Sequence, residues 1–118
     1  MKFDPKSPPR AFDAAGRTLQ DCGAMALEPG EQVTFTTPAG GECDFARTDW
    51  GFYATPSLNG RLAGFGLRGA LVRNADGKNF VVLVEEGRTA AFEAYLDEQK
   101  MQIVRWLDGD LTDLGEGN

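Results

Sequence analysis

The sequence predicts an α+β fold: a mainly antiparallel, curled or barrel-like β-sheet of six to seven strands, with one helix near the C-terminus. Three observations support this prediction. Short segments that alternate apolar and polar residues recur through the chain. Turn sequences rich in glycine separate these segments. Only the segment 88–100 has the apolar spacing of an amphipathic helix.

The 118 residues correspond in length to one domain. We expect residues 1–16 to form an extended arm, because Pro5, Pro8 and Pro9 disfavour a helix there. A single α+β domain follows over 17–108, and 109–118 is a flexible acidic tail. Within the domain, residues 19–27 form either two short strands broken near Gly23 or one strand with a bulge there.

Two hairpins follow along the chain. Segment 31–37 places Val33 and Phe35 on one face of a half-buried strand, and it pairs with segment 42–50 across a glycine-rich loop. The second hairpin joins 67–73 to 79–86 through a turn in which Gly77 supplies a positive φ.

The run 80–84 is apolar at every position, so we expect a central strand that is covered on both faces. The helix at 88–100 supplies one cover through Phe92, Tyr95 and Leu96. A final strand at 101–107 completes a βαβ unit. That unit would lay 101–107 parallel to 79–86 with a right-handed crossover.

Composition excludes several functions. A net charge of −6 argues against nucleic acid or an anionic membrane as a partner, and the N-terminus resembles no secretory signal, so we expect a cytoplasmic protein. The absence of histidine excludes Ser-His-Asp and Cys-His triads and imidazole zinc sites. We expect no metal and no cofactor. Cys22 and Cys43 are expected to be reduced thiols in the core.

One segment differs in charge from the rest of the chain. Residues 47–73 hold four arginines and a single acid, Asp49, whereas the protein as a whole is acidic. Arginine binds carboxylate or phosphate through a planar fork, and the nearby glycines would let backbone amides approach an anion. The GxGxxG-like spacing of GFGLRG lacks the following helix that a dinucleotide site needs, so we reject that match.

We therefore expect a ligand site for an anion in this segment. Trp50 and Tyr53 would stack on the ligand, Arg61 and Arg68 would hold its charge, and Asn59 would bond its hydroxyls. The alternative is that Trp50, Phe52 and Phe65 are core residues, and that the arginines pair with the surplus acids.

The segments DCGAMALEPGEQVTF, WGFYATPSLNGRL and GLRGALVRN, with FVVLVEEGR after them, resemble a family of small bacterial proteins of uncharacterised function. The family is loosely associated with gene clusters for surface-glycan and sugar-nucleotide synthesis. The resemblance covers about residues 18–108. It implies an acidic or phosphorylated sugar as the ligand, and it assigns no catalytic residue.

Three functions follow as hypotheses. The first is a small cytoplasmic binding or accessory protein that recognises an anionic, sugar-derived ligand or an acidic partner surface. The second is a small enzyme of glycan or sugar-nucleotide metabolism, with Tyr53, Asp49 or Glu85 as acid–base groups. The third is a structural module that forms a homodimer through an exposed sheet edge.

Overall fold

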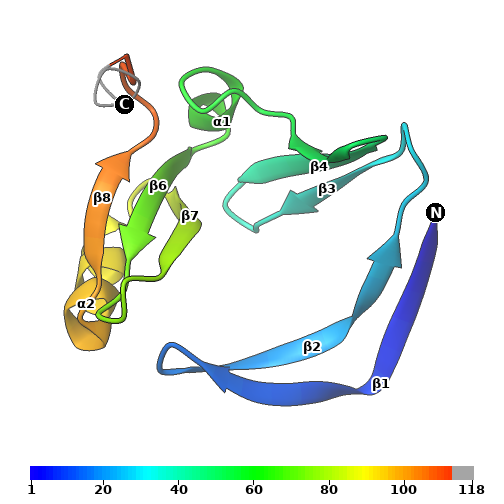
Figure 1. Ribbon diagram of the computed structural model, residues 1–118, viewed down its shortest axis with the longest axis horizontal. Coiled ribbons are helices and arrows are strands. Elements are labelled where there is room, and N and C mark those ends of the chain that lie inside the picture. The colour runs from blue at the N-terminus through cyan, green and yellow to red at the C-terminus, as the bar shows by residue number, and fades with distance from the viewer. Residues whose placement is uncertain (113–118) are drawn as a thin grey trace. The chain divides into compact units, whose positions relative to one another are not determined.

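The computed structural model describes residues 1–112 (Figure 1), and within this range the chain is mostly antiparallel β-structure. The antiparallel α+β prediction is confirmed at this level. The described residues form eight strands in three small sheets and two helices, with no closed barrel, where we expected one curled sheet and one helix. In chain order the elements are β1 (Lys2–Ala14), β2 (Arg17–Ala26), β3 (Gln32–Thr36), β4 (Glu42–Thr48), β5 (Gly51–Ala54), α1 (Arg61–Gly64), β6 (Leu67–Arg73), β7 (Asn79–Glu85), α2 (Thr89–Gln99) and β8 (Gln102–Trp106).

The chain divides into two compact units. Unit 1 comprises Met1–Thr34 and Asp44–Thr55, and unit 2 comprises Phe35–Cys43 and the chain from Pro56 onward. This division does not follow the boundaries at residues 16 and 108 that the sequence suggested. Most of the predicted acidic tail, 113–118, lies outside the described residues.

The N-terminal segment is extended, as its prolines predict, and it pairs antiparallel with β2 as a long hairpin. Pro5 faces Gly23 and Arg10 faces Asp21, so Lys6–Pro9 bulge out opposite a single β2 residue. Proline has no N–H to donate, which suits an irregular stretch of strand. The irregularity therefore lies in β1, and β2 runs through Gly23 as one strand. A Cβ at Gly23 would collide with the carbonyl oxygen of Asp4.

Unit 1 buries no apolar residue among those described. Phe3, Leu19 and Met25 of its hairpin are all exposed. Cys22 is also exposed, which contradicts its predicted place in the core, whereas Cys43 of unit 2 is buried as expected, and the two thiols form no disulfide. A two-stranded hairpin without an apolar core is marginally stable by itself. Backbone pairing and polar contacts must therefore hold unit 1 together.

The main polar contact of unit 1 is made by Asp44, which is only 6% exposed and lies on β4, the middle strand of the sheet β3-β4-β5. Its carboxylate accepts hydrogen bonds from the Thr34 hydroxyl and, at 3.2 Å, from the Thr55 hydroxyl. The Thr55 amide also donates to the Asp44 carbonyl at 3.0 Å. One buried carboxylate thus ties β4 to residues on both sides of it.

Unit 2 contains the apolar core and the sheet β7-β6-β8. Strand β6 pairs antiparallel with both neighbours, with Leu67 opposite Glu85 and Arg73 opposite Asn79 on the β7 side. Strands β7 and β8 therefore run parallel to each other, as predicted, but β6 lies between them. The two strands of the predicted βαβ unit are therefore not neighbours, because β6, which precedes them in the chain, lies between them.

Helix α2 covers one face of this sheet. Leu96 packs with the fully buried Ala70 and Val72 of β6, and the Phe92 and Trp106 rings form a T-shaped pair with centroids 5.9 Å apart. A second apolar cluster joins Leu62 of α1, Leu67 of β6 and Cys43, with Leu58 packed against them.

The prediction that 79–86 forms a covered central strand is wrong. Strand β7 is an edge of its sheet; Val81 is 68% exposed and Phe80 46% exposed. The central strand is β6, whose Ala70 and Val72 are completely buried. An apolar run indicates burial only where other elements cover it, and α2 covers a single face here.

Replacing Asp44 with alanine should lower the free energy of unfolding by about 1.5–3 kcal/mol, because two threonine hydroxyls lose a charged acceptor. Denaturant unfolding measures this difference. The matched control is Asp49→Ala, an exposed acid of the same unit, which should shift stability by less than about 0.5 kcal/mol. Equal effects of the two substitutions would contradict a structural role for Asp44.

Candidate functional site

The five predicted ligand-binding residues are divided between the two units. Trp50 and Tyr53 belong to unit 1, whereas Asn59, Arg61 and Arg68 belong to unit 2. Each group has its own surroundings.

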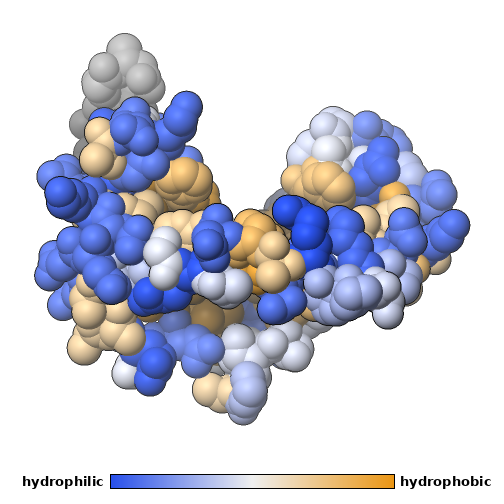
Figure 2. Space-filling view, turned by 90° about the horizontal axis from the view of Figure 1, so that it is seen from below, coloured by the Kyte–Doolittle hydropathy of each residue, from blue (hydrophilic) through white to orange (hydrophobic). Residues whose placement is uncertain are grey.

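The aromatic residues of unit 1 are exposed. Trp50 lies in the two-residue connection between β4 and β5 and is 76% exposed, and Phe52 on β5 is 64% exposed. The alternative that these two side chains are core residues is therefore wrong. Figure 2 shows hydrophobic side chains at the surface among hydrophilic ones. Large aromatic groups left in water at a hairpin tip are a feature of recognition surfaces.

Strand geometry separates the aromatic residues of β5. Phe52 faces Arg47 of β4, and Tyr53 faces Ala46, so the two rings project from opposite faces of the sheet. The Arg47 guanidinium beside Phe52 donates to the carbonyls of Leu27 and Thr48, both at 3.0 Å. That arginine is thus used to join segments of unit 1.

Arg68 is engaged within unit 2. Its Nε and Nη2 donate to the two carboxylate oxygens of Asp108, at 2.6 and 3.3 Å, and its guanidinium lies 3.9 Å from the Trp106 ring centroid. Hydrogen bonds from Arg68 hold the pKa of the Asp108 carboxyl below its ordinary value. For this residue the structure agrees with the alternative in which arginines pair with acids. The guanidinium N–H groups of Arg68 that would bind an external anion already donate to the Asp108 carboxylate.

Arg61 and Asn59 lie at the short helix α1. Asn59 is exposed in the turn before α1, and the Arg61 amide donates to the Ser57 hydroxyl at 2.9 Å. The Arg61 guanidinium lies 5.7 Å from the Phe65 ring centroid. Asn59 thus lies in the turn and Arg61 at the first position of the helix that follows it.

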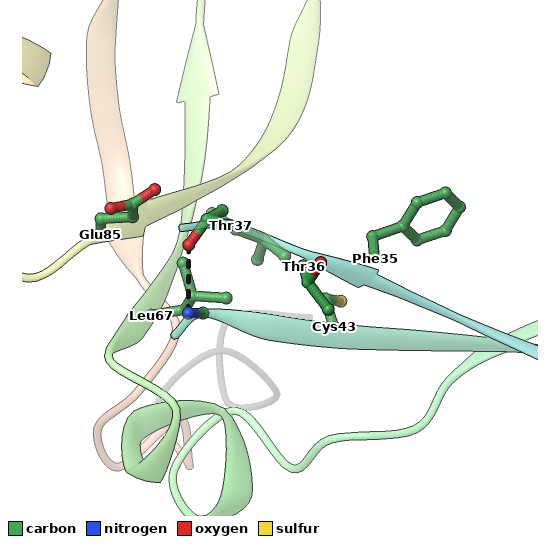
Figure 3. Close-up of a pocket in the computed structure, with 8 residues that line it drawn as sticks. Phe35, Thr36, Thr37, Cys43, Leu67 and Glu85 are labelled. Carbon is green, nitrogen blue, oxygen red and sulfur yellow. Dashed lines mark hydrogen bonds between the residues drawn. The ribbon is translucent and has the colours of Figure 1, made fainter. Parts of the chain in front are cut away.

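Unit 2 also has a pocket of about 190 Å³, lined by Phe35, Thr36, Thr37, Gly41, Cys43, Leu67, Leu83 and Glu85. In Figure 3 Thr37 lies close to Leu67 at the end of the lining where Glu85 stands, and Phe35 lies at the opposite end. The Thr37 hydroxyl accepts a hydrogen bond from the Gly41 amide. Pockets that hold drug-sized ligands usually exceed about 300 Å³, so this one suits a small apolar group better than a nucleotide sugar.

The three acid–base candidates of the enzyme hypothesis are also divided. Asp49 and Tyr53 are exposed in unit 1, and Glu85 lines the pocket of unit 2. Residues 1–112 contain no group of three or more Cys, Asp or Glu side chains placed to hold a metal ion.

Asp44 was not predicted from the sequence, and Phe52 was not included among the predicted ligand-binding residues. The sequence did contain an indication of Asp44. Aspartate is disfavoured inside strands, and Asp44 lies inside a predicted strand, on the face opposite to Cys43 and Phe45. No sequence signal distinguished Phe52, because the four-residue strand β5 and the tight connection before it emerge only in the structure.

The comparisons with known proteins found no matching family model, curated protein or solved structure. The resemblance to small bacterial proteins of glycan gene clusters therefore stays a prediction. Within residues 1–112, no helix has both the length and the apolar character needed to cross a membrane.

The Arg68–Asp108 pair predicts a pH dependence of stability. A carboxyl whose pKa is lowered by folding stabilises the protein above its unfolded pKa of about 4, and that contribution is lost as the pH falls below about 4. Asp108→Asn should therefore lower the melting temperature by a few degrees at pH 7, and the difference from wild type should shrink towards pH ~2.5.

Thermal unfolding at the two pH values measures this effect. The control variant is Asp76→Asn, which changes an exposed acid in the turn after β6. A deficit in Asp108→Asn that is the same at both pH values would show that the ion pair does not stabilise the fold.

Proposed function

We propose that this chain is a small binding or accessory protein that acts through the aromatic tip of the β4–β5 hairpin, formed by Trp50 and Phe52. The observation that carries the proposal is the exposure of these two large side chains, 76% and 64%, in a unit that buries no apolar side chain among its described residues. Folding unit 1 gains nothing from keeping them in water. Binding a partner would gain the burial of both rings.

The chemistry of the tip favours contact through ring faces over contact through charge. Unit 1 has five basic and seven acidic side chains, and its nearest arginine, Arg47, bonds backbone carbonyls. Tryptophan and phenylalanine contribute contact area at little entropic cost, and aromatic residues often dominate protein interfaces. We therefore propose an apolar patch on a second protein as the partner of the tip.

The anionic, sugar-derived ligand remains a prediction that depends on Arg61 and Asn59 of unit 2. Arg68 contributes less to it than we expected, because Asp108 occupies its guanidinium. We propose a cytoplasmic location together with this function. The enzyme hypothesis, with Tyr53, Asp49 or Glu85 as its acid–base group, stays the alternative.

A photo-crosslinking amino acid in place of Phe52 should give a discrete adduct with a partner protein in the producing cells, and the same group at Asp76 should give none. The added variant Trp50→Ala should remove the adduct, because it shrinks the contact surface. Mass spectrometry identifies the partner.

Stability measurements provide the control. The double variant Trp50→Ala/Phe52→Ala should melt within about 2 °C of wild type, because both side chains are already exposed. Leu62→Ala, which empties a buried position, should cost about 2–5 kcal/mol. If the double variant were as unstable as Leu62→Ala and position 52 gave no adduct, the aromatic rings would serve the fold and the proposal would fail.

A screen of sugar phosphates and nucleotide sugars separates the two binding hypotheses. A ligand-induced thermal shift that is lost in Arg61→Ala and kept in the double aromatic variant would favour the anion site over the aromatic tip.

A further inference from the structure

Strand β7 is an edge without the usual protection. Exposed edges are normally guarded by charged residues, proline or short length, because their free backbone groups can pair with another chain. Strand β7 spans seven residues and has neither proline nor a charged residue before Glu85. Its Val81 and Phe80 are 68% and 46% exposed. The opposite edge, β8, is shorter and carries Arg105.

Two hydrogen bonds at the ends of the β6–β7 hairpin fix which backbone groups of β7 are free. The Asn74 amide donates to the Lys78 carbonyl, and the Glu86 amide donates to the Gly66 carbonyl. Antiparallel ladders alternate, so the even-numbered residues of β7 direct their amides and carbonyls at β6. Val81 and Leu83, together with the two end residues of the strand, direct theirs away from the sheet.

Charge is distributed along β7 in a self-complementary way. Lys78 precedes its first residue, and Glu85 and Glu86 stand at its other end. Arg73 adds to the positive end, since its Nε donates to the Asn79 side chain at 2.8 Å. Two such strands laid antiparallel would place each positive end beside the other's negative end.

We propose that β7 is the interface of a homodimer in which it pairs antiparallel with β7 of a second copy of this chain. The register that pairs the whole strand places a two-fold axis at Val82. Val81 then faces Leu83 of the second copy, and Lys78 faces Glu86 of the second copy. This contact goes beyond the proposed role of the β4–β5 tip and uses none of its residues.

The register leaves no outward backbone group of β7 without a partner. Asn79 faces Glu85 of the second copy, beside the Arg73 guanidinium that already bonds the Asn79 side chain. A two-fold contact of this kind closes on itself, so assembly stops at the dimer. Pairing of β7 with β8 of another copy would continue into a fibre instead.

Sedimentation velocity over a range of protein concentrations tests the interface. Wild-type protein should sediment as a dimer at about 100 μM, and Val81→Pro should raise the dimer Kd at least about tenfold. The Val81 amide points away from β6, so proline there removes a contact of the dimer and spares the hairpin. A wild-type protein that stays monomeric at about 200 μM, or that forms species larger than a dimer, would overturn the proposal.

Charge reversal tests the register even if Val81→Pro fails to fold. Lys78→Glu should weaken the dimer by about threefold to tenfold, because it sets two acidic side chains opposite each other in both symmetric contacts. Adding Glu86→Lys to the same chain should restore the wild-type Kd. A dimer that is indifferent to Lys78→Glu, or is not rescued by the double reversal, would use a different surface, and the assignment to β7 would be wrong.

Discussion

The structure of unit 2 depends on the burial of strand β6 from both sides. Its Ala70 and Val72 are completely buried against α2, and its Leu67 packs with Leu62 and Cys43 on the other face. Both other strands of the sheet pair with β6 alone, which makes each of them an edge. A substitution at a buried position of β6 would therefore disturb the apolar cluster on its own face of the sheet, Leu67 on one face and Ala70 or Val72 on the other.

Because the apolar interior is this small, much of the chain's apolar surface stays in water. Exposed side chains lie on edge strands in each unit: Phe52 on β5 in unit 1, and Phe80 and Val81 on β7 in unit 2. Edge strands combine apolar surface with free backbone groups, which are the two elements that strand-mediated association requires. Both proposals depend on apolar side chains left in water, and the dimer proposal depends also on the free backbone groups of β7. They concern different strands, so either can fail without the other.

Local sequence signals predicted the β3–β4 and β6–β7 hairpins and the helix α2, because turn glycines and apolar periodicity depend on neighbouring residues. They did not predict the β1–β2 and β4–β5 hairpins. The turn at 74–78 and the β6–β7 pairing formed as expected. The place of each strand in its sheet could not be read in this way. A run such as 80–84 looks the same in a covered centre and on an apolar edge, and only tertiary packing decides between them. The same limit applies to the site. The charge distribution placed Arg68 in a basic segment, but Asp108, which binds it, lies forty positions away in the sequence, so local patterns could not predict the pair.

Amide hydrogen exchange, resolved by residue and measured at low and high protein concentration, is the most direct test of β6 as the centre and β7 as an interacting edge. Val82 and Val84 should exchange slowly at both concentrations, because their amides face β6. Val81 and Leu83 should exchange rapidly in dilute protein and become protected in concentrated protein. Rapid exchange at Val81 and Leu83 at every concentration, or at Val82 and Val84 in both samples, would contradict these roles of β6 and β7.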